Sequence, residues 1–180
     1  GAFCDGGETC SVELGCVAGI QACTEVQACD EEMDLCQDLT PPDEERFQAA
    51  LGLYRAGQFA AAIAAFEALI AEYPDSNRVD NSRYLIARAH FALGDYAEAE
   101  RLLREFIDTH PTSPQIDEAR YYLARALYEQ GRYADAAAAF QTFLAESPNS
   151  PLRDNASYYL GRSDLALGLF AEAVAAFEQV

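Results

Sequence analysis

The sequence predicts an all-α protein: a right-handed superhelix of about four helix-turn-helix units, preceded by a cysteine-rich segment. The main observation is a pattern that recurs every 37 residues through the last three quarters of the chain. A period of this length is typical of solenoids, in which each unit buries its apolar face only against its neighbours. The recurring residues are Gly57, Gly94, Gly131 and Gly168, then Phe59, Tyr96, Tyr133 and Phe170, then Pro74, Pro111 and Pro148. A second observation is that all six cysteines precede the first unit.

Each unit is expected to contain a first helix, a glycine turn, a second helix and a loop at proline. Gly94 is placed to end a helix in the left-handed conformation, which glycine adopts at little cost. Asp95 can then cap the next helix, and Pro111 stops it. The predicted boundaries are residues 1–43 for the cysteine-rich segment and 44–180 for the solenoid, with units at about 44–79, 80–116, 117–153 and 154–180.

Small and large residues alternate along each second helix. Two helices approach closely only where side chains are short, so a recurring alanine marks a contact between helices. A large apolar residue four positions later is expected to fill the space between units. The alanines are Ala62, Ala99, Ala136 and Ala173, and the large residues are Phe66, Leu103, Phe140 and Phe177.

The spacing of glycine, aromatic residue, alanine, large apolar residue and proline resembles the tetratricopeptide repeat, over about residues 44–180. That family's usual unit has roughly 34 residues. The additional residues here lie in the loops DSNRVD, TSPQID and NSPLRD. Longer units with such loops resemble a bacterial envelope subgroup that includes the Tol–Pal cell-division coordinator and the outer-membrane assembly lipoprotein. The resemblance implies a periplasmic or secreted helper without catalysis.

The first 43 residues are expected to be crosslinked. An even number of cysteines packed into a short acidic segment indicates disulfides in an oxidising compartment. The cysteines are Cys4, Cys10, Cys16, Cys23, Cys29 and Cys36. Their pairing, within or between chains, stays open because six cysteines allow fifteen intrachain pairings. A helix is expected within residues 17–36. The absence of a starting methionine fits a processed protein that is secreted to the extracellular space or, alternatively, the periplasm.

The charge of the chain argues against nucleic acid and anionic lipid as partners. The formal net charge is −18, and every base is an arginine. Residues 1–46 hold 12 acids and one base. Such a chain repels phosphate backbones and acidic membranes. No apolar run has the length of a membrane span, so membrane insertion is not expected.

The first helices carry a repeated tyrosine–arginine pair. The resemblance implies that these helices line a concave groove. Within a helix, residues four apart share one face. The predicted partner-binding residues are Tyr84, Arg88, Tyr121, Arg125, Tyr158 and Arg162. Arginine forks suit carboxylates, so the groove is expected to bind an acidic protein segment. The alternative is that the tyrosines pack between helices and the arginines pair with neighbouring glutamates.

The last unit is expected to expose an apolar end. Leu167, Ala173, Phe177 and Val180 form this predicted assembly end. Uncovered apolar surface favours association. The first functional hypothesis is a secreted structural protein that assembles head to tail into a disulfide-stabilised filament, because unlike ends that join repeatedly form an open fibre. The second is an envelope adaptor whose groove binds a different protein.

Catalysis and metal binding are not expected. Neither His90 nor His110 has a recurring Cys, Asp or Ser partner in the local sequence, and lone histidines on helices are mostly structural. The cysteine spacing contains no C-x-x-C pair of the kind that zinc and iron–sulfur sites favour. The acidic run at residues 30–34 lacks the glycine and spacing of a calcium loop. No cofactor is predicted, and the protein is expected not to be an enzyme.

Overall fold

The computed structural model describes residues 27–30, 35–38 and 42–180. The chain divides into two compact units, Gly1–Glu45 and Arg46–Val180, which we describe separately. In the first, strands β1 (Gln27–Asp30) and β2 (Leu35–Asp38) pair antiparallel, with Cys29 opposite Cys36. The helix expected within 17–36 is therefore wrong for the described part of that stretch, where the two short strands satisfy each other's backbone groups instead. The cysteine side chains lie outside the described part of the chain, so their disulfides stay a prediction.

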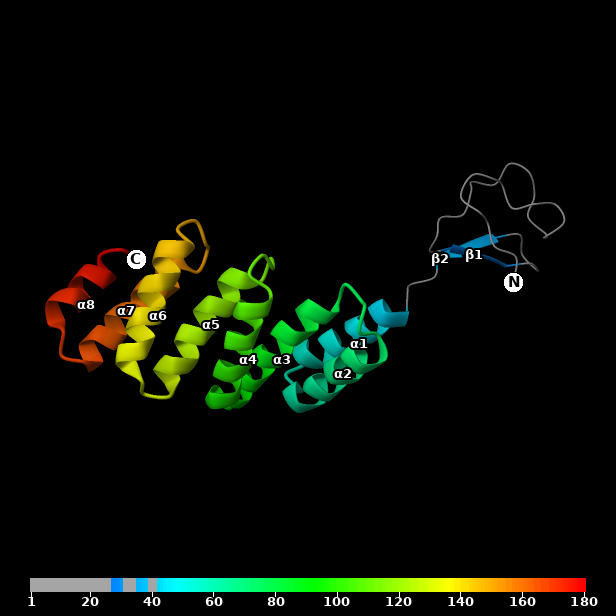
Figure 1. Ribbon diagram of the computed structural model, residues 1–180, viewed down its shortest axis with the longest axis horizontal. Coiled ribbons are helices and arrows are strands. Elements are labelled where there is room, and N and C mark those ends of the chain that lie inside the picture. The colour runs from blue at the N-terminus through cyan, green and yellow to red at the C-terminus, as the bar shows by residue number, and fades with distance from the viewer. Residues whose placement is uncertain (1–26, 31–34, 39–41) are drawn as a thin grey trace. The chain divides into compact units, whose positions relative to one another are not determined.

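The second unit is the predicted all-α solenoid. Its helices follow one another in a row, and each packs on the next from α2 to α8 (Figure 1). The helix α3 also contacts α5, and α5 contacts α7. The helices are α1 (Pro42–Arg55), α2 (Phe59–Glu72), α3 (Val79–Leu93), α4 (Tyr96–Thr109), α5 (Ile116–Glu129), α6 (Tyr133–Glu146), α7 (Arg153–Ala166) and α8 (Phe170–Phe177). They form four hairpins in the predicted order, and the right-handed sense stays a prediction.

The glycine turns have the conformation expected from the sequence. The recurring glycines have φ between 74° and 85°, which other residues adopt only with strain. At Gly94 the left-handed residue follows α3 and its N–H bonds back to the carbonyl of Phe91. This closes the helix and turns the chain into α4 within two residues.

The predicted cap at Asp95 is wrong in one respect. Asp95 occupies the N-cap position of α4, but its side chain makes no capping hydrogen bond. Its carboxylate lies 3.5 Å from the His90 imidazole instead. The backbone carbonyl of Asp95 accepts the first helical bond, from Ala99. The entry to this helix is therefore held by backbone geometry, and the carboxylate is oriented towards α3.

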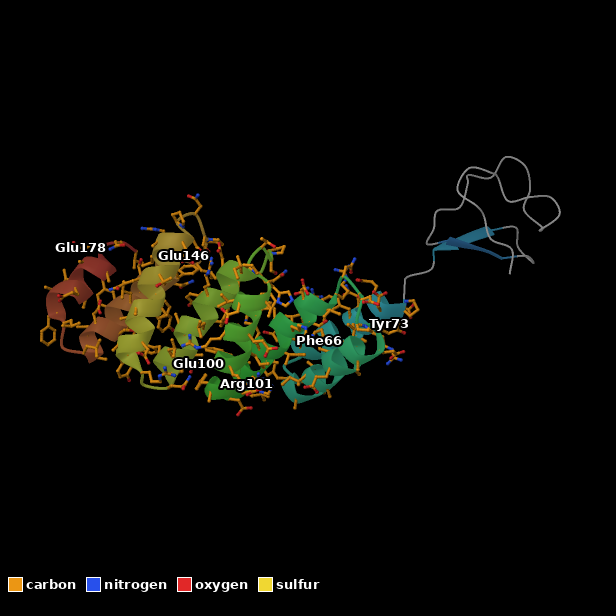
Figure 2. All side chains as sticks on the ribbon, viewed as in Figure 1. Phe66, Tyr73, Glu100, Arg101, Glu146 and Glu178 are labelled. Atoms are coloured by element: carbon orange, nitrogen blue, oxygen red, sulfur yellow. The ribbon has the colours of Figure 1, made fainter. Side chains whose placement is uncertain are left out.

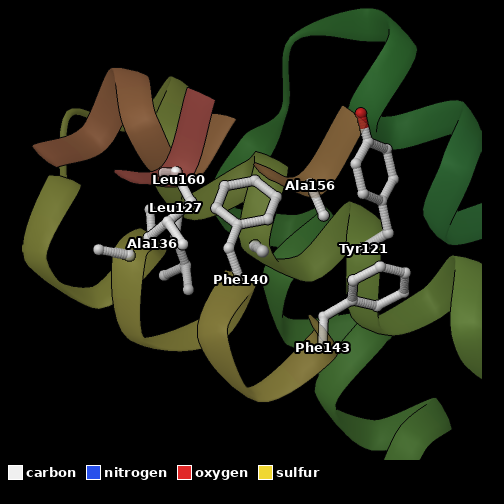
Figure 3. Packing of buried hydrophobic residues seen from close by; sticks show 10 residues of the cluster. Tyr121, Leu127, Ala136, Phe140, Phe143, Ala156 and Leu160 are labelled. Carbon is white, nitrogen blue, oxygen red and sulfur yellow. The ribbon is translucent and has the colours of Figure 1, made fainter. Parts of the chain in front are cut away.

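The core confirms the alternation of small and large residues. All four recurring alanines are fully buried. Phe66, Leu103 and Phe140 are fully buried too, whereas Phe177 is only partly covered. Within the third hairpin, Tyr121 of α5 meets Phe143 of α6 edge-on, with ring centroids 6.0 Å apart, and the same cluster includes Leu160 of the fourth hairpin (Figure 3). The core is thus a series of interlocking clusters, one at each junction.

The loops that lengthen the repeat share one structure. In each, a serine two residues after the proline bonds its backbone N–H to the residue before that proline. Its hydroxyl then accepts a backbone N–H two residues further on. The serines are Ser76, Ser113 and Ser150. The extra residues therefore form a compact turn, which explains how a longer unit keeps a regular stack.

Glu100, which is labelled in Figure 2, is the centre of an ionic cluster that joins the second hairpin to the third. One carboxylate oxygen lies 2.7 Å from Arg132 and 2.9 Å from the Gln130 amide, and the other lies 3.0 Å from Arg104. Burial raises the pKa of Glu100, but the hydrogen bonds from Gln130, Arg104 and Arg132 outweigh it, and the net pKa is lowered. This stabilisation is therefore present at neutral pH and is lost as the pH falls through the lowered pKa.

A matched pair of glycine substitutions tests the turn geometry. Gly131→Ala should reduce the free energy of unfolding by about 1 kcal/mol, because the alanine must adopt a positive φ. Gly52 lies inside α1, and a Cβ added there would meet nothing within 4 Å. Gly52→Ala should therefore raise stability by about 0.5–1 kcal/mol. Urea unfolding followed by circular dichroism measures both, and equal shifts of the two variants would contradict this account.

Candidate protein-binding surfaces

The predicted tyrosines do not form a ladder of exposed rings. Tyr84 and Tyr121 are only 5% and 4% exposed, whereas Tyr158 is 43% exposed. Tyr84 packs 5.9 Å from Phe106, and Tyr121 packs 6.1 Å from Phe140. The expectation that these two rings meet a partner is therefore corrected: each is enclosed by its own hairpin and the next one. Tyr158 is exposed because no further helix packs on α7 from that side among the described residues.

The paired arginines bond to these tyrosines. The Arg88 guanidinium donates to the Tyr84 hydroxyl at 2.9 Å, and Arg125 donates to Tyr121 at 3.3 Å. Burial raises the pKa of Tyr84 to about 12, although the charge of Arg88 opposes the shift. In the unfolded state the tyrosine hydroxyl has its ordinary pKa of 10.0 and ionises first. The folded protein therefore loses stability as the pH rises from 10.0 to about 12. Each tyrosine and its arginine lie on one face of the helix, as predicted. They bond to each other, however, and the tyrosine hydroxyl is not left free for a partner.

Each arginine also stacks on an aromatic ring of the following hairpin. The guanidinium carbon of Arg88 lies 3.7 Å from the ring centroid of Tyr122, and that of Arg125 lies 3.9 Å from Tyr159. Such cation–π contacts contribute up to about 2 kcal/mol when they are shielded from water. The sequence analysis missed Tyr122 and Tyr159. The doubled tyrosines at 121–122 and 158–159 were the available signal, since both members repeat at the same interval.

Arg125 shows how fully an internal arginine is engaged. Besides Tyr121 and Tyr159, it lies 5.5 Å from the Phe91 ring and forms an ion pair with Glu129 at 2.9 Å. Its side chain is 19% exposed. Hence the alternative in which arginines pair with neighbouring glutamates describes Arg125 in part, and its main contacts are aromatic. An internal arginine of this kind links three hairpins and offers little free surface.

Arg162 is the exposed member of the same series. It lies 5.3 Å from the Tyr128 ring of the preceding hairpin, as Arg125 lies over Phe91. The rings of Tyr158 and Tyr159 lie 5.8 and 5.9 Å from Arg162, so no described ring approaches it as closely as Tyr122 approaches Arg88. Three residues on, Leu165 is 46% exposed, while its counterpart Tyr128 meets the edge of Tyr159 with centroids 5.3 Å apart. The α7 face thus has the arginine of an inner junction but not the tyrosine of a following hairpin that would cover it.

Exposed apolar side chains gather on α7, α8 and the residues beside them. Of the eight large apolar residues exposed in the described part of the chain, seven lie there: Tyr158, Leu165, Leu167, Leu169, Phe170, Val174 and Val180. We call this set the α7–α8 patch. Leu167 and Val180 were predicted at this end, and they are 42% and 63% exposed. Exposed apolar side chains gathered at one end make this patch the candidate contact surface.

Two residues predicted at that end are covered. Ala173 is fully buried because α8 packs against α7 through this small side chain, so its predicted exposure is wrong. Phe177 is half-buried, and its ring lies over Gly161. A Cβ at Gly161 would come within 2.7 Å of that ring. Gly161 therefore allows α8 to close on α7, and the exposed surface comes from neighbouring leucines and Phe170.

The first helix has a different outer face. The α1 residues Glu45, Gln48, Ala49 and Gly52 are all exposed. Their counterparts one, two and three intervals along the chain form the junctions: Ser82, Ala119 and Ala156; Leu85, Tyr122 and Tyr159; Ile86, Leu123 and Leu160; Ala89, Ala126 and Ser163. At the second and third of these positions α5 and α7 have a tyrosine and a leucine and α3 has two aliphatic residues, whereas α1 has Gln48 and Ala49. It thus lacks the groups that cover an arginine.

The two histidines lie in structural contacts. His110 stacks on Phe106, its Nε2 lies 3.0 Å from Asp80, and its Nδ1 lies 2.6 Å from the Thr109 hydroxyl. The Thr109 hydroxyl donates its own proton to the Glu105 carbonyl, so it is not poised as a nucleophile. The sequence missed Asp80 as the partner because it lies 30 residues away in the chain. In the next hairpin, Ser147 bonds to Asp117 at 2.5 Å in the same place.

The described residues contain no group of three or more His, Cys, Asp or Glu side chains that could hold a metal ion. None of the described helices has the length and apolar character needed to cross a membrane. What this part of the chain does offer is one apolar end, one polar end and a buried series of tyrosine and arginine contacts between them. These features define a class of protein, a helical-hairpin solenoid with interaction surfaces.

Comparisons with known proteins support the tetratricopeptide-repeat family for these hairpins. The family model for the tetratricopeptide repeat matches residues 84–151, and the model for subunit 3 of the anaphase-promoting complex, or cyclosome, matches residues 33–106. No curated protein sequence matches this chain. The two models overlap on the second hairpin and together span most of the solenoid. The relation to the bacterial envelope subgroup stays a prediction.

Solved structures of repeat proteins share the fold. MamA AMB-1 is 19% identical with a TM-score of 0.61, covering 76% of this chain and 70% of that chain. MamA 41-end from Desulfovibrio magneticus RS-1 is 17% identical with a TM-score of 0.64, covering 76% and 72%. A putative Podosopora anserina kinesin light chain, with nearly identical TPR-like repeats, is 22% identical with a TM-score of 0.61, covering 76% and 72%. At these identities the likeness shows the fold.

An arginine pair tests the structural role of the stacked guanidinium groups. Arg125→Gln removes contacts with three hairpins and should lower the free energy of unfolding by about 1–2 kcal/mol. Arg101→Gln removes only surface ion pairs to Glu98 and Glu105, so it should leave the melting temperature nearly unchanged. Thermal unfolding at neutral pH measures both. If Arg101→Gln proved as damaging as Arg125→Gln, the aromatic contacts would not be the cause.

Proposed function

We propose that this protein is a non-enzymatic scaffold that binds other proteins, and that its principal contact surface is the α7–α8 patch. The carrying observation is the concentration of exposed apolar side chains there, beside Arg162, which is exposed and lacks the close ring contact of Arg88 and Arg125. Tetratricopeptide repeats imply protein–protein interaction. The tyrosine side of the first helices is a weaker candidate, because Tyr84 and Tyr121 are buried.

The occupant that fits the patch is a helix of a partner protein that places an aromatic ring on Arg162. The two inner junctions define this chemistry. In each, a tyrosine of the incoming helix covers an arginine at 3.7–3.9 Å, and a leucine follows directly in the sequence. Small residues lie three positions before and four after that tyrosine, as with Ala119 and Ala126 around Tyr122. The partner helix is therefore expected to have the pattern small-x-x-aromatic-Leu-x-x-small.

A second candidate function is the head-to-tail, disulfide-stabilised extracellular filament. The acidic, cysteine-rich first 43 residues and the apolar end at α7–α8 favour it. In a simple continuation of the stack, however, α1 of one copy would place Gln48 on Arg162 of the next and Glu45 where the inner junctions have Ser82, Ala119 or Ala156. We therefore infer that a filament would depend on residues 1–41 for its contact.

The periplasmic envelope adaptor is the form of scaffold that the resemblance to longer, loop-extended repeats supports. Secretion or periplasmic location also agrees with six cysteines confined to one short segment. An acidic partner segment remains compatible with Arg162, which is the exposed arginine of the series. Both forms require an oxidising compartment and a protein partner, and they differ in whether that partner is another copy.

A peptide experiment tests the proposed occupant. The probe is a labelled synthetic peptide of residues 113–130, which carries Tyr122 in its native helix, titrated with the full chain and followed by fluorescence anisotropy. It should bind about fivefold more tightly than the same peptide with Tyr122→Gln, since one cation–π contact contributes about 1 kcal/mol. Arg162→Gln in the full chain should remove this difference, whereas Arg101→Gln should leave it intact.

Equal binding of the two peptides would contradict the proposed occupant. Sedimentation of the full chain, with and without a reducing agent, separates the two candidate functions. Large assemblies that disappear on reduction favour the filament, and a monomer that binds the probe peptide favours the adaptor.

A further inference from the structure

Asp164 is a buried acid at a position that favours apolar residues. It lies near the end of α7 and is only 4% exposed. Its counterparts at the same interval are Leu53, His90 and Leu127, and Leu127 is a core residue with 2% exposure. A carboxylate is costly to bury unless it is paired. The last hairpin thus departs from the pattern that the other hairpins follow.

Nothing in the described part of the chain neutralises this carboxylate. Burial raises the pKa of Asp164, and the charge of Glu172 raises it further, while no base lowers it. In the second hairpin, the corresponding residues are His90 and Glu98, and the pKa of Glu98 is lowered, chiefly by the hydrogen bond from Arg101 and to a smaller extent by His90. The last hairpin therefore has two acids where the second has an acid and a base.

The two acids line an open-sided cavity of about 330 Å³ between α6 and α8, with α7 as its floor. Its apolar lining includes Leu144, Leu160 and Ala176, and Gln141 and Gln179 also line it. An apolar wall with a few convergent polar groups is the general form of a ligand site. Here the converging charges are both negative.

We propose that this cavity binds a cationic side chain, a guanidinium or primary ammonium on an aliphatic stem. The cation would pair with Asp164 and Glu172, and the stem would lie on Leu144 and Leu160. A hard metal ion fits less well, because calcium takes six to eight oxygen ligands and the cavity offers two carboxylates. The ligand chemistry is that of an arginine or lysine side chain, whether it comes from another protein or from a second copy.

This site is independent of the contact proposed at Arg162. It lies on the side of the second helices, and it requires a base where the other contact requires a ring. Failure of either proposal therefore leaves the other in place.

Asp164 also affects the stability of the fold when no ligand is bound. Its raised pKa means that the ionised carboxylate opposes folding, so the penalty is absent below its ordinary pKa of 3.8 and present at neutral pH.

The test uses n-butylammonium chloride and the uncharged n-butanol as probes, with the full chain followed by NMR. Binding of the cation should shift the amide signals of Ala175 and Ala176 and lower the measured pKa of the Asp164 carboxyl. Asp164→Leu, which restores the residue of the first and third hairpins, should bind the cation at least tenfold more weakly and melt at a higher temperature at neutral pH. That gain should vanish below pH 3.8.

Glu178→Gln is the matched control, because it removes one exposed acid at the C-cap of α8 that does not line the cavity. It should bind the cation like the wild type, which excludes a general attraction to a chain of charge −18. The proposal is overturned if Asp164→Leu and wild type bind the cation equally, or if n-butanol binds as well as the cation. If the wild type also self-associates and Asp164→Leu does not, the base comes from a second copy; a monomer that binds the probe indicates another protein.

Discussion

The structure depends on the junction between one hairpin and the next. A single hairpin has one apolar face on each side and cannot bury either alone. Burial of the recurring alanines brings the helices close enough for the large residues to interlock. The arginine that stacks on the following tyrosine then adds a directional contact to a hydrophobic one. A guanidinium held between two rings remains charged, so the junction combines core packing with a group that a partner can also recognise.

At these junctions one hairpin contributes an arginine and the next contributes the tyrosine that covers it. The two ends of the solenoid therefore differ. The arginine face, which includes Arg162 and Leu165, is basic and apolar. The opposite face on α1, which includes Gln48 and Ala49, has polar and small side chains. Two identical ends can join face to face, and two complementary ends can join in series. These ends are neither identical nor complementary. The asymmetry therefore favours a partner with its own aromatic helix over simple stacking of copies.

Sequence reasoning recovered the fold because the signal is strong and local: a glycine with positive φ, a buried alanine and a terminating proline recur in phase. The site was harder to predict, since helical spacing says that Tyr121 and Arg125 share a face but not whether that face is covered by the next hairpin. The same spacing gave Tyr122 no special weight, although it makes the closer contact. The pairing of His110 with Asp80 spans a whole hairpin and leaves no local pattern. Such contacts depend on how hairpins stack, which a single repeat does not encode.

The last hairpin departs from the repeat rules in two independent ways, and both point outwards. Arg162 lacks the close ring that covers Arg88 and Arg125, and Asp164 places a charge without a partner among the described residues where Leu127 is core. Either feature lowers the stability of the isolated solenoid, because unpaired charge and exposed apolar surface are both unfavourable. A ligand that supplied a ring to one and a base to the other would remove both penalties at once. The free energy of binding would then come largely from removing these two penalties in α7 and α8, so the stability of this hairpin should depend on a bound partner.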